Sequence, residues 1–383
     1  MKEALVVGGS SGIGLAVSIE LAKKCEKVFI ADKVRPNIED LPENCDWRYV
    51  DLTQTDFKWL EEYNGIDTLF FSAGIGRVTL FENLHPKEID KIFQINTIAP
   101  FRVLHHFINR LKGDKPFFCG VMVSIAGRIA SPLFSVYSAS KAALFRGLEA
   151  INTELTTTGS PNRILEVSPG SISGTSFNGN ATDVDLLLPL ARSIITEMGK
   201  RSILYIPEYD EIFKRVIENY KNDPEGFAIE SFRYKKDNNR ISEKPQIKIG
   251  YLSGTFDLFH IGHLNLLRRA RQYCDYLVVG VHKDASHKGK TTFIPYEERK
   301  EIIKNIKYVD EVIESEKEDS DVYTKGIVKY DRLFVGSDYK GTERFNRYEE
   351  YFKDKGVEII YFPYTTGTSS SQLREALSVM SKK

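Results

Sequence analysis

Tyr137 and Lys141 stand four positions apart, and Ser124 precedes the tyrosine by thirteen residues. Positions i and i+4 share one face of a helix, so the Lys141 ammonium can lie beside the Tyr137 phenol. A neighbouring cation favours the phenolate and lowers the tyrosine pKa from about 10 towards working pH. Such a phenol can donate a proton to a developing alkoxide. The spacing therefore predicts a proton relay for carbonyl reduction; a core tyrosine and a solvated lysine are the structural alternative.

A glycine-rich turn lies near the start of the chain, between a predicted strand and a predicted helix. Glycines there let the backbone approach a pyrophosphate, which the amides and dipole of the helix N-terminus hold. Asp32 ends the next predicted strand, where its carboxylate can accept hydrogen bonds from an adenosine ribose. A tight turn without a ligand and a capping aspartate are the alternatives. The turn residues with a predicted role in cofactor binding are Gly8, Ser10, Ser11, Gly12, Ile13 and Gly14.

His260 and His263 flank Gly262 at a predicted helix start, directly after another strand-like run. Backbone amides at a helix start hold phosphates, and imidazoles there can donate to an α-phosphate as charge builds during in-line attack. A zinc site is one alternative, but no third Cys, His or Asp ligand stands at a useful spacing, so we expect no protein-held metal. An inert pair of histidines is the other alternative. The pattern favours nucleotidyl transfer.

These residues need strands and helices to bring them together, and apolar strand-like runs do alternate with amphipathic helical stretches. That alternation indicates a parallel sheet with helices on both faces. The predicted strands of the first part are Ala4–Val7, Lys27–Ala31, Asp67–Phe71, Phe118–Val123 and Ile164–Val167, and its predicted helices include Leu15–Lys24, Pro86–Phe93 and Ala139–Thr153.

The composition changes after about residue 235, where charged and amide residues followed by Pro245 indicate an exposed linker. The alternation then resumes, with strands predicted at Lys248–Leu252, Tyr276–Val281, Arg332–Val335 and Glu358–Phe362. We therefore expect an α/β fold class: two Rossmann-like, doubly wound parallel-sheet domains in tandem. Their predicted bounds are 1–235 and 247–383, with a linker over 236–246.

The overall composition narrows the functional classes. Among 383 residues, 53 basic and 53 acidic ones give no net charge, which is not typical of a general nucleic-acid binder. No uncharged apolar stretch has the length of a membrane span. The four cysteines are far apart and form no CxxC pair, so neither a disulfide framework nor a zinc knuckle is indicated. We expect a cytoplasmic protein without nucleic-acid or membrane partners.

With these motifs in order, the first domain resembles the short-chain dehydrogenase/reductase family over about residues 1–235. The resemblance implies that Ser124 and Tyr137 hydrogen-bond a substrate carbonyl. It implies that Lys141 tunes Tyr137 and holds the nicotinamide ribose, and that Asn96 supports a water relay. Further motif positions assigned to NAD(P)H binding are Asp51, Leu52, Ala73, Gly74, Pro169 and Gly170.

The choice between the two nicotinamide cofactors depends on three neighbouring residues. The Asp32 carboxylate disfavours the 2′-phosphate of NADP by charge repulsion. Lys33 and Arg35 follow it and can offset that repulsion. We expect NAD(P)H, with NADH slightly favoured.

The second domain resembles the HxGH nucleotidyltransferase superfamily, most closely the glycerol-phosphate cytidylyltransferases, over about residues 247–383. The resemblance implies that His260 and His263 stabilise the transition state. It also implies that two lysines and a Ser/Thr-rich helix start hold phosphates, although a solvated lysine face is the alternative. The nucleotide-binding positions it implies are Gly254, Thr255, Phe256, His260, His263, Lys288, Lys290, Asp338, Thr368, Ser369 and Ser370.

Together the two resemblances imply consecutive reactions: reduction of a ketose phosphate to an alditol phosphate, then coupling to CTP with Mg²⁺. The product would be a CDP-alditol for teichoic-acid or capsule synthesis. A pentulose such as ribulose 5-phosphate is favoured, and a hexulose phosphate comes next. The alternatives are a phosphonate or other small aldehyde as substrate, and a nucleotide-sensing protein with one degenerate site. Both families commonly oligomerise, so we expect a homo-oligomer, a dimer or tetramer.

Overall fold

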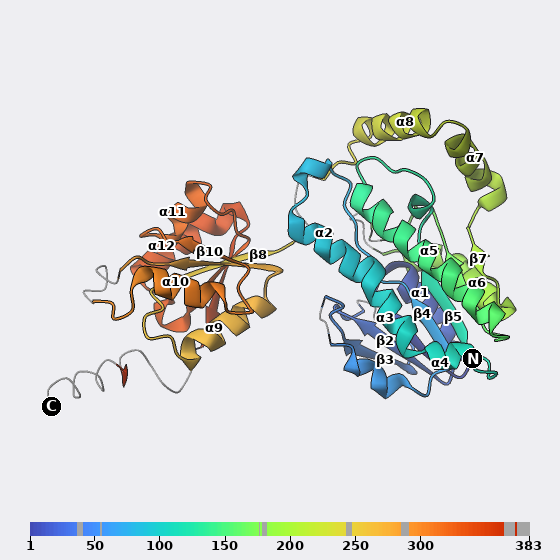
Figure 1. Ribbon diagram of the computed structural model, residues 1–383, viewed down its shortest axis with the longest axis horizontal. Helices are drawn as coiled ribbons and strands as arrows, with labels where there is room; N and C mark the ends of the chain where they lie inside the picture. Colours follow the sequence, from blue (N-terminus) through green and yellow to red (C-terminus); the bar gives the residue numbers. More distant parts are fainter. Residues whose placement is uncertain are drawn as a thin grey trace. The chain divides into compact units, whose positions relative to one another are not determined.

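The computed structural model describes residues 1–36, 41–53, 56–175, 177, 182–242, 247–284, 291–363 and 372–373. The chain divides into two compact units, residues 1–244 and 245–383 (Figure 1). The first unit ends later than the expected residue 235 because helix α8 (Pro224–Asp237) continues past it. The Ser242 amide then donates a hydrogen bond to the Val78 carbonyl at 2.8 Å.

The first unit is built on a seven-stranded sheet in the order β3-β2-β1-β4-β5-β6-β7, and every neighbouring pair is parallel. The strand order reverses between β1 and β4, and ligands of such sheets bind at that point, beyond the carboxyl ends of the strands. The strands are β1 (Glu3–Val7), β2 (Lys27–Asp32), β3 (Cys45–Tyr49), β4 (Thr68–Phe71), β5 (Phe118–Met122), β6 (Ile164–Val167) and β7 (Leu204–Tyr205).

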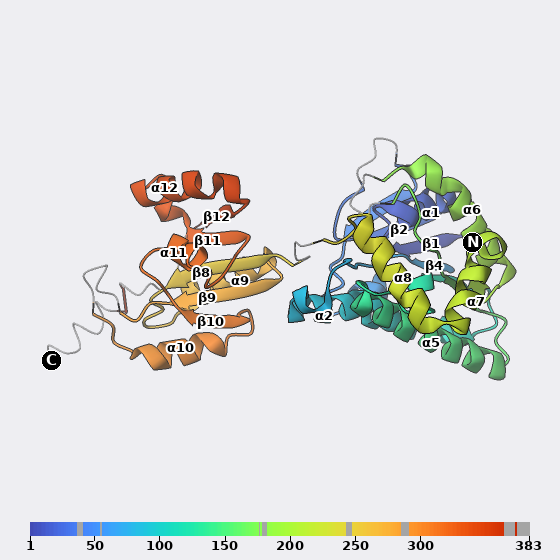
Figure 2. The same cartoon turned by 90° about the horizontal axis from the view of Figure 1, so that it is seen from above.

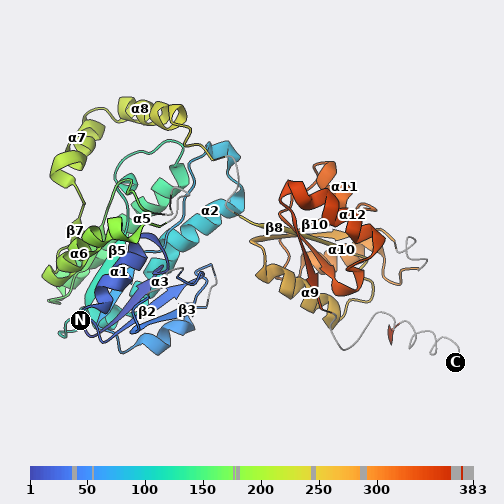
Figure 3. The ribbon, with the colours of Figure 1, turned by 180° about the vertical axis from the view of Figure 1, so that it is seen from behind.

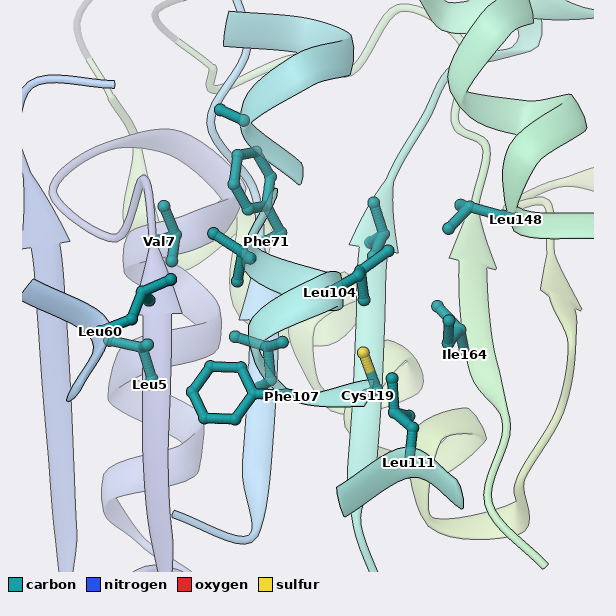
Figure 4. Packing of buried hydrophobic residues seen from close by; sticks show 14 of the residues in the cluster. Leu5, Val7, Leu60, Phe71, Leu104, Phe107, Leu111, Cys119, Leu148 and Ile164 are labelled. Carbon is teal, nitrogen blue, oxygen red and sulfur yellow. The ribbon is translucent and has the colours of Figure 1, made fainter. Parts of the chain in front are cut away.

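Helices cover both faces of this sheet, as the uninterrupted apolar strands require. In β1, Leu5 and Val7 face one core and Ala4 and Val6 face the other. Figure 4 shows the first core, with Val7, Phe71, Leu104 and Cys119 packed together. Helices α3 (Ala99–His106), α4 (Ile108–Lys112) and α5 (Ser135–Thr157) cover that core, whereas α1 (Gly12–Ala22) and α6 (Val184–Lys200) cover the other.

After β7 the chain makes an excursion through α7 (Lys214–Asn222) and α8 before it leaves the first unit. Figures 1 and 3 both show α7 and α8 arching over the carboxyl-terminal edge of the sheet. Asp223 begins α8 by accepting the Gly226 amide at 2.9 Å, and Pro224 occupies the first helical turn. The excursion therefore lies above the edge where a ligand of this sheet would bind.

The second unit has a five-stranded parallel sheet in the order β10-β9-β8-β11-β12, with the reversal between β8 and β11. Helices α9 and α10 cover one face and α11 and α12 the other (Figure 2). Two doubly wound parallel sheets confirm the predicted fold class. The elements are β8 (Ile249–Gly254), α9 (Ile261–Gln272), β9 (Tyr276–Val281), α10 (Tyr296–Lys304), β10 (Glu311–Glu314), α11 (Asp319–Thr324), β11 (Arg332–Gly336), α12 (Glu343–Phe352) and β12 (Glu358–Phe362).

A search of the described residues finds no helix that combines the length and the apolarity needed to cross a membrane.

Two candidate active sites

The first site lies where the N-terminal turns of α5 meet the carboxyl end of β5. Ser124 follows β5, and its hydroxyl hydrogen-bonds the side chain of Tyr137 from α5. The same hydroxyl lies 3.5 Å from the Pro169 carbonyl oxygen and accepts the Ala126 amide at 3.2 Å. The structure thus joins the Pro169-Gly170 motif beyond β6 to the Ser124–Tyr137 pair.

Lys141 lies one helical turn beyond Tyr137, with its Nζ 5.8 Å from the centre of the tyrosine ring. Its ammonium is buried and donates to the Met122 carbonyl at 3.0 Å. Burial lowers the pKa of Lys141 to about 7 and raises the pKa of Tyr137 to about 12, against the opposing hydrogen bond from Ser124. The expected lowering of the tyrosine pKa is therefore absent, because desolvation penalises the phenolate and also discharges the neighbouring lysine.

Asn96 is fully buried within a π-helical turn, Gln94–Ile98. Such turns insert one residue into a helix and often mark functional sites. The Asn96 Oδ1 accepts the Ile75 amide at 2.9 Å, and its Nδ2 donates to the Ile75 carbonyl at 2.8 Å and to Ser140 Oγ at 3.0 Å. The side chain thus fastens the loop after β4 to α5.

Gly74 lies in that same loop, beside Asn96 and Lys141. A Cβ on Gly74 would lie 3.3 Å from the Lys141 Nζ and 3.5 Å from the Asn96 Oδ1. Asn96, Gly74 and Lys141 therefore form one cluster.

An aromatic wall covers the Tyr137 ring, and the sequence analysis did not anticipate it. Phe134 stacks on Tyr137 with ring centres 4.2 Å apart, and Phe177 lies 5.3 Å from Tyr137. Phe213, from the excursion that begins after β7, packs so closely on Gly170 that a Cβ there would overlap its ring. Phe177 and Phe213 are distant from Tyr137 in the sequence, so no spacing pattern indicates that they lie near it.

The glycine turn after β1 is tightly packed, as a close approach of backbones requires. Gly8 has a φ of +80°, and a Cβ there would overlap Ala73; a Cβ on Gly14 would overlap the Gly8 carbonyl. At the start of α1 the Gly12 amide donates to the Thr182 hydroxyl at 3.1 Å. The Ser10 Oγ is buried without a hydrogen-bond partner among the described residues. The Ser10 hydroxyl and the Gly12 amide, which here donates to a hydroxyl oxygen, are groups of the kind that bind the phosphate oxygens of a dinucleotide.

The two acidic residues predicted to bind the cofactor, Asp32 and Asp51, also hold groups of the protein itself. Asp32 accepts the Ser10 amide at 3.0 Å and so ties β2 to the glycine turn. Asp51 accepts hydrogen bonds from Thr53 and from Lys33, whose Nζ lies 2.9 Å away. Burial alone would raise the pKa of Asp51, but these hydrogen bonds outweigh it and lower that pKa. Of the other predicted positions, Leu52 accepts a hydrogen bond from Gln94 through its carbonyl.

Four arginines are candidates for binding a substrate phosphate, and each of them contacts another group of the protein. Arg77, 1% exposed, pairs with Glu88 at 2.8 Å and donates to the Ser242 carbonyl, also at 2.8 Å. Arg128 pairs with Glu166 at 2.6 Å. Arg146 is mostly exposed and pairs with Glu149, and Arg102 lies over the Phe57 ring.

A cavity of about 510 Å³ lies beside α5 but not at this site. It is lined by Ser135, Ser138, Ala139 and Ala142, which share the outer face of the helix, together with Tyr220 from α7. Ser131 and Pro132 of the loop before α5 also line it, whereas the buried Tyr137 and Lys141 do not.

The second site forms where β8 meets α9. His260 begins the helix and accepts the Gly262 amide at 3.0 Å through its Nδ1. The rings of His260 and His263 lie 4.0 Å apart, and Phe256 and Phe259 pack beside His263. Burial lowers the pKa of His260, which favours the neutral ring, and since Nδ1 accepts a hydrogen bond the neutral ring carries its proton on Nε2.

The turn between β8 and α9 is strained and firmly anchored. Phe256 and Leu258 have φ values of +52° and +50°, a region that residues other than glycine rarely adopt outside functional sites. The buried Asp257 accepts the amides of Phe293 and Ile294. This turn therefore needs support from the segment before α10.

Arg299 also supports the turn between β8 and α9, because it hydrogen-bonds the Thr255 carbonyl. It is fully buried and donates to the carbonyl oxygen of Thr255, which follows β8, and to those of His282, Lys283 and Ile294, which lie between β9 and α10. The Thr255 Oγ1 is buried without a partner among the described residues and suits a ligand oxygen. The five predicted residues of this site lie at the end of β8, in the turn that follows, and at the start of α9: Gly254, Thr255, Phe256, His260 and His263.

Asp338 is exposed beyond the carboxyl end of β11, the neighbour of β8 across the strand-order reversal. In the part of the chain that the structure describes, no group of three or more His, Cys, Asp and Glu side chains could hold a metal ion. The predicted phosphate-binding residues Lys288, Lys290, Thr368, Ser369 and Ser370 lie outside the described residues.

Comparison with known proteins finds a family match in each of the two units. A family described as short chain dehydrogenase matches residues 2–185, and one described as cytidylyltransferase-like matches residues 251–376. The glycerol-3-phosphate cytidylyltransferase of Bacillus subtilis is 38% identical over 130 residues, covering 33% of this chain and 93% of that protein. An uncharacterized oxidoreductase of Saccharomyces cerevisiae is 28% identical over 216 residues, covering 51% of this chain and 70% of that protein.

Solved structures support the fold of the first unit. A short chain dehydrogenase from Burkholderia cenocepacia, solved in complex with NADP, has a TM-score of 0.51 and 19% sequence identity, covering 60% of this chain and 99% of that chain. At this identity the likeness concerns the fold alone. The family matches show a short-chain dehydrogenase domain in the first unit. Together with the Bacillus subtilis relative, they show that the second unit belongs to the cytidylyltransferase-like family, so the chain combines an oxidoreductase domain with a cytidylyltransferase domain.

Proposed function

We propose that the first unit reduces a ketose phosphate to an alditol phosphate and that the second unit couples this product to CTP. The observation that carries the proposal is the presence, in one chain, of a buried Ser124–Tyr137–Lys141 cluster in the first unit and of two neighbouring histidine rings, His260 and His263, in the second. The two reactions are consecutive because reduction creates the alditol phosphate that the second unit would consume.

When bound, the nicotinamide cofactor would supply the hydride that the carbonyl carbon receives. Ser124 and Tyr137 hold the carbonyl oxygen, and the Tyr137 hydroxyl gives it a proton. Lys141, with a pKa of about 7, can return a proton to Tyr137 at working pH. Asn96 bonds both to the loop that follows β4 and to α5, and it thereby fixes the distance between them and supports the relay.

The geometry around β2 supports NADH over NADPH. Lys33, which could neutralise a 2′-phosphate, is paired with Asp51 at 2.9 Å. The carboxylate of Asp32 stands at the end of β2, where it would repel such a phosphate and accept ribose hydroxyls instead. Ser10 and the start of α1 would hold the pyrophosphate.

In the second reaction, a phosphate oxygen of the alditol phosphate attacks the α-phosphorus of CTP. A new P–O bond forms, the bond from the α-phosphorus to the bridging oxygen breaks, and pyrophosphate leaves. His260 and His263 donate hydrogen bonds to the α-phosphate and the bridging oxygen, where negative charge grows. Mg²⁺ would enter bound to the CTP phosphates and would neutralise part of their charge.

The name of the Bacillus subtilis relative supports an alditol phosphate as acceptor and CTP as donor. A pentulose phosphate such as ribulose 5-phosphate is the favoured first substrate and a hexulose phosphate the second. The product would be a CDP-alditol for a surface polysaccharide such as teichoic acid or capsule. The enzyme would work in the cytoplasm as a homo-oligomer.

The test is a panel of pentulose and hexulose phosphates with NADH or NADPH, followed by CTP and Mg²⁺, monitored by phosphorus NMR. We expect a phosphomonoester signal to be replaced by a diphosphate diester and pyrophosphate, only after reduced cofactor is added. Reaction with ATP in preference to CTP, or CDP-product formation from the ketose phosphate without reduction, would contradict the proposal.

A further inference from the structure

Lys235 reaches from α8 towards the reductase site. Its Nζ donates to the Ser131 Oγ and to the Pro132 carbonyl, each at 2.7 Å, in the loop that leads into α5. It lies 5.9 Å from the centre of the Phe134 ring, which itself stacks on Tyr137 at 4.2 Å. The ammonium is therefore no farther from the Tyr137 ring than these two distances together, a span that a sugar phosphate can bridge.

The hydrogen-bond partners of this ammonium are uncharged. Both of its acceptors are neutral, and no ion pair within the described residues joins Lys235 to a carboxylate. Burial, and after it the charge of Arg240, lowers the pKa of Lys235 to about 8, so most molecules still carry the charge at pH 7. A partly buried cation without a counterion is unfavourable, and its third N–H remains able to bind an anion.

We propose that Lys235 binds the phosphate group of the substrate while Tyr137 protonates its carbonyl, which makes the first unit selective for phosphorylated ketones. This inference rests on the proposed function. Arg77 and Arg128 are paired with carboxylates, whereas both hydrogen-bond acceptors of Lys235 are neutral. The aromatic wall of Phe134 and Phe177 would cover the carbon chain between the two ends of the substrate.

The kinetic test compares Lys235→Met with Lys236→Met in the full chain. Lys236 is an exposed neighbour on α8, so its variant makes the same change in charge. We expect Lys235→Met to raise KM for the best ketose phosphate about tenfold to a hundredfold, as expected for a lost charged hydrogen bond, and to leave KM for the unphosphorylated ketose unchanged. An equal loss with both ketoses would show that Lys235 only fastens α8 and would overturn the proposal.

A second test does not depend on the reaction. In the full chain with ¹³C-methylated lysines, the Lys235 signal is assigned by its absence from Lys235→Met and titrated with and without inorganic phosphate. We expect phosphate to raise the pKa of Lys235, and an unchanged titration would overturn the proposal. If the wild type reduces no phosphorylated ketone, the proposed function fails, whereas this titration still decides whether Lys235 binds phosphate.

Discussion

Replacing Gly76 with alanine should disable the reductase by displacing its proton donor. An alanine Cβ there would lie 2.5 Å from Cδ2 and 2.9 Å from Cγ of Tyr137, and 3.1 Å from Cε2 of Phe134. Ordinary contacts begin near 3.4 Å, so the tyrosine ring must move by about 1 Å, and a misplacement of that size can cost about 10²-fold in rate. We expect kcat for ketose phosphate reduction to fall about a hundredfold.

The assay is steady-state NADH oxidation, with Gly199→Ala as the matched control. Nothing lies within 4 Å of a Cβ at Gly199 in α6, so this variant should keep its kcat and gain up to about 1 kcal/mol of helix stability. Cytidylyl transfer by Gly76→Ala should also stay normal, and thermal unfolding will show whether the first unit remains folded. A folded Gly76→Ala enzyme with kcat within threefold of wild type would refute the reasoning.

Three further predictions concern the two sites. Tyr137→Phe should lower ketose reduction about 10²–10⁴-fold but leave CDP-alditol formation from added alditol phosphate intact; loss of both, measured by phosphorus NMR, would contradict separate sites. His263→Ala should do the reverse, lowering nucleotidyl transfer about 10²–10³-fold, and mixing the two variants should restore the pathway unless the intermediate is not released. Lys141→Met should raise the free energy of unfolding at pH 7, because the folded pKa of Lys141 is depressed to about 7. This gain should shrink as pH rises towards 10.5, where the unfolded lysine also loses its proton, and a gain that does not change with pH in urea denaturation would refute the assigned burial.

The sequence predicts the central strands and the reactive side chains because both leave strong local signals. Strands buried on two faces are continuous apolar runs, and Tyr137 and Lys141 share a helical spacing. The edge strands β3 and β10 were not predicted, because Cys45–Tyr49 and Glu311–Glu314 mix charged residues with partly buried ones. Helices α7 and α8 bury no residue fully, and α8 includes residues 236 and 237, which the sequence places in a linker.

The electrostatics of the site could not be predicted from spacing alone. The i, i+4 relation of Tyr137 and Lys141 predicts their proximity, but the sign of each pKa shift depends on how deeply the pair is buried. Likewise, the position of Lys33 directly after Asp32 suggests a contact with a 2′-phosphate, but its ammonium forms an ion pair with the Asp51 carboxylate. Both outcomes depend on contacts between residues that only the tertiary fold brings together.

The Ser242 carbonyl determines where the reductase can be cut from the chain. It accepts a hydrogen bond from Arg77, whose guanidinium is almost wholly enclosed and also serves Glu88, Thr79 and Asn83. A truncation at residue 235 would remove this acceptor and leave a buried N–H without a partner, at a cost of about 1–3 kcal/mol. Because Arg77 directly follows Gly76, the damage would begin one residue from the glycine that packs on Tyr137. A reductase fragment expressed alone should therefore extend at least through Ser242.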